Sequence, residues 1–267
     1  MKLRSIGIGA AVFAVVFALL LCGCSNSAST QSASEGPDYA DDEAMTIIAK
    51  GLEARWAIID ATSYEDNAEN LKKAVNAELE IDKPLRDRQF EDAKMQGDVL
   101  NYINTLEDSL EVLEKYPYQS SDYYDKWDSV YNTRTSQLKN LVDKYDLTVS
   151  ENKQSTLDEL LTAGTAAQNK TERDDAINGL FEKATFEKTD QGYGYYEYTA
   201  TIENTTDFSF KDVGIVLALY DSEGVRAGET YTSIKSWDKG EKARFEAGSD
   251  IDAEKVKASV DYYAVSE

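Results

Sequence analysis

The sequence has no histidine and only two cysteines, Cys22 and Cys24, among its 267 residues. Without histidine it cannot supply a histidine general base, a Ser-His-Asp triad, or a zinc or iron site with histidine ligands. The two cysteines stand close together near the N-terminus, so no disulfide framework ties the rest of the chain together. These absences exclude much of ordinary enzyme chemistry, and we expect a chain that is not an enzyme and uses no metal or cofactor.

Positive charge is also scarce, with 28 Lys and Arg against 50 Asp and Glu and a formal net charge of −22. A surface this acidic repels phosphate backbones and anionic lipid headgroups. We therefore expect no nucleic acid among the partners. The length suits about two domains, each large enough to bury its own core.

The N-terminus has the pattern of an export signal. Lys2 and Arg4 precede an apolar run from Ile6 to Leu21. That run has the length of a signal peptide and is too short and too N-terminal to indicate a mature membrane span. Residues 1–23 are thus predicted to be a signal peptide.

The run ends in Leu21-Cys22-Gly23-Cys24, which resembles the lipobox of bacterial lipoproteins. The resemblance implies that Cys24 becomes the mature N-terminus and carries a diacylglyceryl thioether with fatty acyl chains such as palmitate. The chain would then be held at the extracytoplasmic face of the cell membrane, since two acyl chains anchor a protein stably. An uncleaved signal anchor is the alternative. Residues 24–40, rich in Ser, Ala and Thr, are predicted to form a flexible tether.

From 41 to 183 the apolar residues recur at helical spacing, which predicts a helical bundle domain. Pro84 and Pro117 interrupt the pattern, as proline does in helix interiors. Short connections between the helices favour antiparallel neighbours. The first apolar stripe comprises Met45, Ile48, Leu52, Trp56 and Ile59.

Two groups in this region are candidate sites. Paired carboxylates serve as general acid and base in glycoside hydrolysis, but negative charge is also favoured at helix N-termini. We favour helix N-termini for the six carboxylates Asp41, Asp42, Glu43, Asp122, Asp125 and Asp128. A tyrosine group near a helix junction could form a ligand platform, but packing across the junction is commoner. Its members are Tyr116, Tyr118, Tyr123 and Tyr124.

After residue 184 apolar and polar residues alternate, which predicts strands near 196–203, 213–219, 228–236, 242–247 and 255–265. Several short strands with turns at this spacing predict a β-sandwich over 184–267. The alternation sends Tyr193 and Tyr195 to the face opposite Tyr196 and Tyr198, so the first two are a candidate exposed binding surface. In the last strand, the alternation places Val256, Ala258, Val260 and Tyr262 on one face.

This stretch resembles the FxLYD domain, an immunoglobulin-like module of bacterial surface proteins. The resemblance rests on Tyr198 with the Glu-Asn-Thr-Thr-Asp turn at 203–207, on Lys211-Asp212-Val213, and on two signatures. These are Leu217-Ala218-Leu219-Tyr220-Asp221 and Lys239-Gly240-Glu241 before Phe245. Leu217 stands where the family has phenylalanine, and Lys239 stands where proline is common. The resemblance implies a fold and a location but no reaction.

Two acidic turns could hold calcium, but neither fits a twelve-residue EF-hand loop, and turn chemistry is favoured. They contain Asp221 and Glu223, and Asp250, Asp252 and Glu254.

Together the patterns predict an α+β multidomain chain, with an N-terminal antiparallel helical bundle followed by a C-terminal immunoglobulin-like β-sandwich. The expected function is that of a membrane-anchored, non-catalytic surface lipoprotein that binds an envelope protein or a glycan. The alternatives are a solute-binding lipoprotein of a transporter and a carboxylate-based cell-wall hydrolase.

Overall fold

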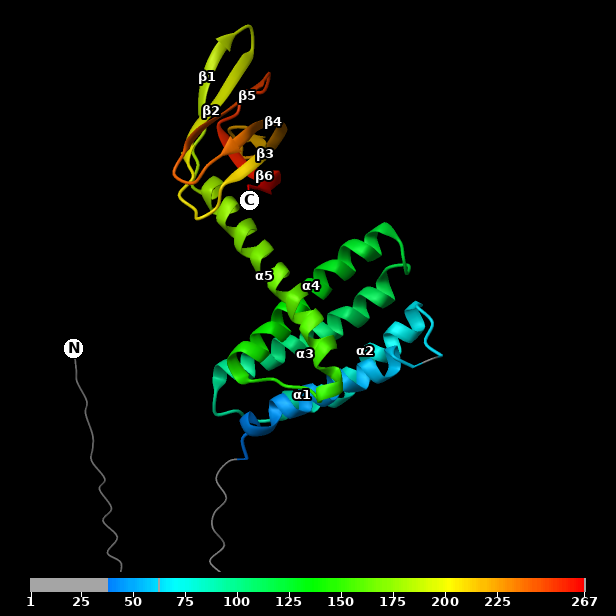
Figure 1. Cartoon of the computed structure of the whole chain (residues 1–267). Coiled ribbons are helices and arrows are strands. Elements are labelled where there is room, and N and C mark those ends of the chain that lie inside the picture. The colour runs from blue at the N-terminus through cyan, green and yellow to red at the C-terminus, as the bar shows by residue number, and fades with distance from the viewer. Residues whose placement is uncertain (1–37, 62, 267) are drawn as a thin grey trace, which may run out of the picture. The chain divides into compact units, whose positions relative to one another are not determined.

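The computed structural model describes residues 38–61 and 63–266 (Figure 1). Within these residues, five α-helices are followed by two antiparallel sheets of three strands each, so the chain is a mixed α+β protein. The predicted signal peptide, the lipobox residues Leu21, Cys22, Gly23 and Cys24, and the tether up to residue 37 lie outside the described residues. No helix in the described part of the chain is both long enough and apolar enough to cross a membrane.

The helices begin and end where the sequence supplies caps and breaks. The side chains of Asn67, Asp92 and Ser120 accept hydrogen bonds from backbone N–H groups in the first turns of α2, α3 and α4. Pro84 lies in the short 3₁₀ helix η1 that follows α2. The bounds are α1 Asp41–Ile59, α2 Ala68–Asp82, η1 Lys83–Asp87, α3 Ala93–Lys115, α4 Ser121–Tyr145, η2 Glu151–Lys153 and α5 Gln154–Glu182.

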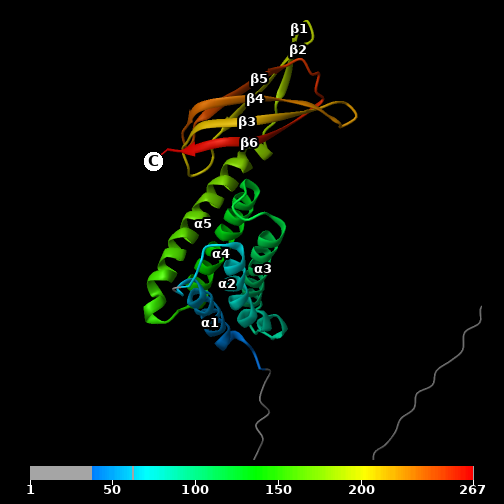
Figure 2. The ribbon, with the colours of Figure 1, turned by 90° about the vertical axis from the view of Figure 1, so that its right-hand side faces the viewer.

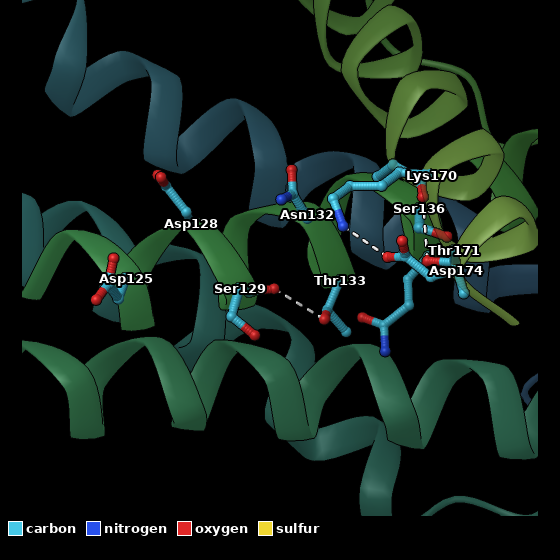
Figure 3. Close-up of a pocket in the computed structure, with 11 residues that line it drawn as sticks. Asp125, Asp128, Ser129, Asn132, Thr133, Ser136, Lys170, Thr171 and Asp174 are labelled. Atoms are coloured by element: carbon cyan, nitrogen blue, oxygen red, sulfur yellow. Dashed lines mark hydrogen bonds and ion pairs between the residues drawn. The ribbon is translucent and has the colours of Figure 1, made fainter. Parts of the chain in front are cut away.

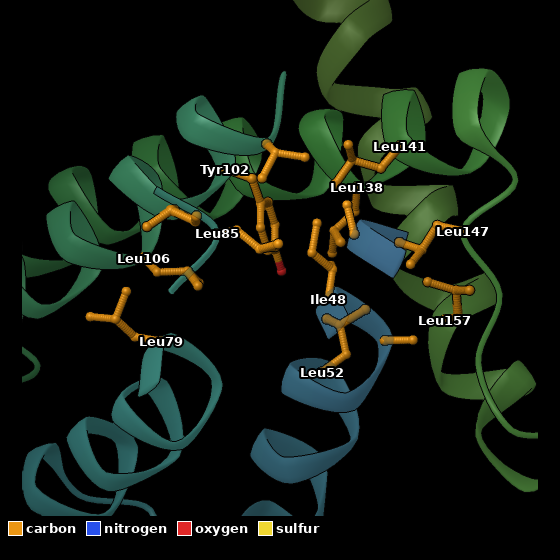
Figure 4. Packing of buried hydrophobic residues seen from close by; sticks show 14 of the residues in the cluster. Ile48, Leu52, Leu79, Leu85, Tyr102, Leu106, Leu138, Leu141, Leu147 and Leu157 are labelled. Atoms are coloured by element: carbon orange, nitrogen blue, oxygen red, sulfur yellow. The ribbon is translucent and has the colours of Figure 1, made fainter. Parts of the chain in front are cut away.

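Helices that are neighbours in the sequence pack on one another, from α1 against α2 to α4 against α5. Their apolar stripes meet in one cluster (Figure 4). Its fully or almost fully buried members include Ile48, Leu52, Tyr102, Leu106, Leu138, Leu141 and Leu157. Ile48, Leu52 and Trp56 of the predicted first stripe belong to this cluster, so the helical periodicity identified the buried face of α1.

The C-terminal strands form two sheets, with the orders β1-β2-β5 and β4-β3-β6 (Figure 2). The inward faces of β2 and β3 are those that the alternation predicted, with Tyr198, Ile202, Val213 and Leu219 buried. The strands are β1 Glu187–Gly192, β2 Tyr195–Glu203, β3 Phe210–Tyr220, β4 Arg226–Trp237, β5 Lys242–Ser249 and β6 Lys255–Val265.

Both sheets and the last turns of α5 contribute to one hydrophobic cluster. From α5, Ile177, Leu180 and Phe181 are buried in it. The Phe181 ring lies 5.1 Å from that of Phe245 and 5.7 Å from that of Trp237. The core around the sheets thus includes residues that precede the predicted boundary at 184, because α5 continues from the bundle into this core as a single 29-residue helix.

Two features of the sheets differ from the sequence prediction. Strand β1 was not predicted, because its six residues are polar and it is defined by pairing with β2. The placement of Tyr262 with Val260 was wrong. Residues Val260 and Tyr262 pair with the adjacent Ile215 and Gly214, so Asp261 is an extra residue in β6. This bulge leaves Tyr262 exposed and packs Tyr263 against the core instead.

Candidate binding groove along helix α5

A polar groove of ≈ 580 Å³ lies between α4 and α5 (Figure 3). The two helices meet closely at Gly164, where a Cβ would come within 2.8 Å of the carbonyl carbon of Thr135. The groove begins at Ala167, about one turn further along α5. Its lining is Asp125, Asp128, Ser129, Asn132, Thr133, Ser136 and Gln137 of α4, with Ala167, Lys170, Thr171 and Asp174 of α5.

Only some of the charged side chains in this groove form ion pairs. The Lys170 ammonium lies 2.6 Å from the Asp174 carboxylate, which also accepts a 2.5 Å hydrogen bond from the Tyr263 hydroxyl of β6. Burial works to raise the pKa of Asp174, but the hydrogen bonds from Lys170 and Tyr263 outweigh it and hold the pKa below its usual value. Asp125 and Asp128 form no hydrogen bond or ion pair with any described residue, so two carboxylates are left to attract cations.

A second section of the groove, ≈ 910 Å³ in volume, lies between α5 and β6. Strand β6 is an edge of its sheet and pairs only with β3. Its other side therefore presents backbone N–H and C=O groups that no strand satisfies. The section is lined by residues 260–266 of β6 and by Ala166, Lys170, Arg173, Asp174 and Asn178 of α5.

Tyr263 holds the two walls of this section together. Its hydroxyl bonds Asp174 on α5, and its ring meets Phe210 of β3 edge to face at 5.5 Å. Burial, together with the hydrogen bond to Asp174, raises the pKa of the Tyr263 hydroxyl well above its usual value, so it stays a proton donor at neutral pH. Tyr263 thus contacts α5 through its hydroxyl and β3 through its ring, and these two contacts set the spacing between α5 and β6.

A buried ionic cluster lies elsewhere in the helical region. Glu78 of α2 is fully buried and accepts hydrogen bonds from Arg55 of α1 at 2.9 Å and from Arg134 of α4 at 2.8 Å. The Tyr102 hydroxyl of α3 also donates to Glu78. Burial works to raise the pKa of Glu78, but the two arginines bring it below its usual value, so Glu78 is ionised.

Asp82, one turn after Glu78, is fully buried and neither carboxyl oxygen has a hydrogen-bond partner. Burial, and then the charge of Glu78, raise the pKa of Asp82 to about 9, against the opposing effect of Arg134. Asp82 is thus a neutral carboxylic acid at pH 7. Asp82 lines neither section of the groove, so its protonation affects the packing of the helical bundle and not a ligand in the groove.

The structure corrects the interpretation of the acidic residues. Asp122 lies in the first turn of α4, as predicted, but Asp125 and Asp128 lie beyond that turn and line the groove. Asp41, Asp42 and Glu43 lie in the first turn of α1, as predicted. Asp41 also accepts hydrogen bonds from the N–H groups of Glu91 and Asp92, at 2.8 Å each, and so ties α1 to the start of α3. Periodicity alone did not reveal that α5 lies opposite Asp125 and Asp128.

The tyrosines near the junction of α3 and α4 pack on one another. The Tyr123 ring is buried, 4.9 Å from Tyr118 and 5.8 Å from Trp127, while Tyr124 is half exposed. The Tyr118 hydroxyl donates to Asp66 at 2.6 Å. These contacts favour packing over a ligand platform.

Tyr193 and Tyr195 are both exposed, but alternation accounts only for Tyr195, which lies in β2 on the face opposite Tyr198. Tyr193 and Gly194 form the two-residue turn between β1 and β2, with φ of 56° and 77°. Tyr195 lies across Gly248 of β5, where a Cβ would come within 2.9 Å of the tyrosine ring. The two side chains therefore belong to a hairpin tip and a sheet face.

The residues of the predicted family signature lie in the core, in a cation–π contact or in a tight turn. Leu217 and Leu219 are buried in β3. Tyr220 lies under the Lys257 ammonium, 5.5 Å from the ring centre. Gly240 has φ of 79°, as a tight turn requires, and the Glu241 carbonyl accepts a 3.1 Å hydrogen bond from the Trp237 indole.

In the two acidic turns, the carboxylates form hydrogen bonds and ion pairs with other groups of the C-terminal region. Asp221 accepts hydrogen bonds from the N–H groups of Glu223 and Val225 at 2.9 Å. In the other turn, Asp252 lies 2.5 Å from the Lys188 ammonium, with Glu254 3.8 Å from the same group. No cluster of acidic residues suited to a metal ion occurs in the described part of the chain.

No protein-family model and no curated protein matches the chain. A solved structure that does match is the Pseudomonas fluorescens alkylpurine DNA glycosylase AlkC bound to DNA containing an abasic site analog. The two chains are 10% identical, the match covers 80% of this chain and 75% of the glycosylase chain, and the TM-score is 0.21.

That neighbour is an enzyme bound to DNA, and it contradicts the expectations that this chain is a non-catalytic interaction protein, is not an enzyme and has no nucleic acid among its partners. We withdraw these three expectations. Because a TM-score of 0.21 carries no argument for a shared fold or activity, we do not assign the glycosylase's activity to this chain.

Proposed function

We propose that this chain is a lipid-anchored protein of the extracytoplasmic face of a bacterial membrane, and that the groove along α5 binds an extended peptide segment. The anchor is supported by the basic start, the apolar run and the Leu21-Cys22-Gly23-Cys24 sequence. The groove is supported by one observation above all. The open edge of β6 lines a space of ≈ 910 Å³ whose opposite wall is a helix.

The C-terminal part is proposed to be an immunoglobulin-like sandwich of the FxLYD type. Two antiparallel three-stranded sheets share one hydrophobic cluster, as the two layers of a sandwich do. The burial of Leu217 and Leu219 and the turn at Gly240 support this proposal.

An open sheet edge beside a helix suits an extended chain. A peptide can add as a further strand, with its backbone bonding the free N–H and C=O groups of the edge, while its side chains alternate between the walls. The bulge at Asp261 breaks the regular edge, so the pairing segment is 262–266.

Charge favours a peptide with Lys or Arg side chains. On the α4 side the groove holds three carboxylates, and Lys170 offsets only one of them. Asp125 and Asp128 are therefore available to basic side chains, and the net charge of −22 attracts a basic partner at long range.

To test the groove, a phage-displayed library of random heptapeptides is selected on the chain from residue 38 onward. Selected peptides should combine alternating β-branched residues with Lys or Arg and should protect the backbone amides of 262–266 from hydrogen exchange. Ala166→Trp fills the groove from an exposed helix position and should weaken binding at least tenfold. Thr162→Trp, exposed one turn earlier on the same helix and outside the groove, should leave binding unchanged.

The proposed binding site would be contradicted by selected peptides that bind equally well to the Ala166→Trp and Thr162→Trp variants, or that protect backbone amides other than those of 262–266. The anchor is tested separately by replacing Cys24 with alanine. Loss of radiolabelled palmitate and release from the membrane fraction are expected, and a variant that still incorporates palmitate would rule out the lipid on Cys24.

A further inference from the structure

A second hollow, ≈ 150 Å³ in volume, lies on the outer face of the β4-β3-β6 sheet and shares only Asp261 and Tyr262 with the lining of the peptide groove. Tyr231 of β4 and Tyr262 of β6 flank it, with 58% and 54% of their surfaces exposed. Its other lining residues are Gly214, Ile215, Thr232, Ser233 and Asp261.

The glycine between the two tyrosines shapes the hollow. A Cβ at Gly214 would come within 2.8 Å of the Tyr262 ring, so this ring lies directly on the strand at a position that only glycine leaves free. The ring is held against the sheet while more than half of the side chain remains open to solvent. The bulge at Asp261 is what turns Tyr262 outward.

The remaining lining is polar. Ser233 supplies a hydroxyl group, and the Asp261 carboxylate has no hydrogen bond or ion pair with the described residues. The hollow therefore combines exposed aromatic rings with hydroxyl and carboxylate oxygens, within a space of about five water volumes at ~30 Å³ each. It is much smaller than the ~300–1,000 Å³ of pockets for drug-sized ligands.

We infer that this hollow binds one pyranose ring of a neutral polysaccharide. The C–H face of a sugar ring is apolar and fits against a tyrosine ring, while its hydroxyl groups donate to a carboxylate and exchange hydrogen bonds with Ser233. Asp261 disfavours a phosphate-bearing ligand at the same place, because like charges repel. A sugar in an open, shallow hollow of this size is one unit of a longer chain.

The inference is tested on the chain from residue 38 onward with four soluble probes: laminarin, xylan, dextran and a 20-nucleotide single-stranded DNA. Affinity electrophoresis should show retardation by at least one polysaccharide, and an excess of the DNA should leave that retardation unchanged. Tyr231→Ala removes one wall and should weaken binding at least tenfold, whereas Tyr262→Phe keeps the aromatic ring and should bind within about twofold of the parent chain.

Tyr195→Ala is the matched control, since Tyr195 is also half exposed and lies over a glycine, but in the other sheet. It should bind as the parent does, and so should Ala166→Trp, which keeps this outcome separate from that of the peptide groove. A polysaccharide affinity that survives Tyr231→Ala, retardation by none of the three polysaccharides, or displacement of the bound polysaccharide by the DNA would each overturn the inference.

Discussion

Gly51 of α1 lies directly against Asp82 at the end of α2. A Cβ at Gly51 would stand 2.9 Å from the carboxyl carbon of Asp82, closer than side chains tolerate. The absent side chain thus leaves room for a carboxyl group that is fully buried and has no hydrogen-bond partner. The pair marks the place where the packing of the helical bundle depends on a single titrating group.

The first prediction concerns the charge of Asp82. Its pKa is about 9 in the folded chain and near 3.8 when exposed, so folding takes up a proton between these values. A raised carboxyl pKa means that stability falls as the pH rises from about 4 to 9. Asp82→Asn removes this proton uptake and should raise the free energy of unfolding by more than about 1 kcal/mol at pH 8.

Urea denaturation of both chains at pH 5, 6.5 and 8 gives the measurement. The difference between Asp82→Asn and the parent should grow with pH, because other titrating groups affect both chains alike. A difference that is constant over this range would mean that Asp82 titrates at its ordinary pKa.

The second prediction concerns the space at Gly51. Gly51→Ala forces a methyl group against the Asp82 carboxyl and should destabilise the chain by about 1–3 kcal/mol, as overpacking does. Gly97→Ala in α3 is the matched control, since no atom lies within 4 Å of its Cβ position. That change should stabilise the chain by up to about 1 kcal/mol through helix propensity. Thermal melts that show the same sign for both variants would count against the close packing at Gly51.

The third prediction concerns Glu78. Glu78→Gln leaves the buried guanidinium groups of Arg55 and Arg134 without their shared counter-charge. Removing one partner of a buried ion pair costs about 3–5 kcal/mol. Glu80→Gln, an exposed change on the same helix, should alter stability by less than about 0.5 kcal/mol. Equal urea midpoints for the two variants would show that the cluster adds nothing to stability.

The fourth prediction concerns where the C-terminal folding unit begins. Because Ile177, Leu180 and Phe181 lie in the core of the sheets, a fragment of residues 174–267 should melt cooperatively and at a higher temperature than one of residues 184–267. In the longer fragment, Leu219→Ala should cost about 2–5 kcal/mol, as for other buried leucines. Identical melting temperatures for the two fragments would show that the end of α5 is dispensable.

Much of the architecture could be predicted from the spacing of apolar residues. A period of 3.6 indicated the helical region, and alternation indicated the buried faces of β2 and β3, because a stripe or a face must be covered by another element. Ser120 is a residue type that favours helix caps, and its side chain accepts a hydrogen bond from the N–H of Tyr123, three residues later. These features depend on neighbours that are close in the sequence.

The contacts that form the candidate sites join residues that are far apart in the sequence, so they could not be predicted from it. Glu78 and Arg134 are 56 residues apart, and no local pattern distinguishes a buried Glu78 from an exposed Glu80. Asp125 and Asp128 follow a helix start closely enough to resemble N-terminal charges, yet the position of α5 makes them groove residues.

The spacing of apolar residues is sufficient to predict the helices, most of the strands and the faces that are buried, because hydrophobic periodicity is a local property of the chain. The strand β1, the bulge at Asp261 and the outward position of Tyr262 over Gly214 follow instead from contacts between elements of the folded chain. The burial of Asp82 was decided in the same way, by the absence of a side chain on α1. Pairing, bulges and burial of polar groups follow from which surfaces meet, and that is settled when the whole chain packs.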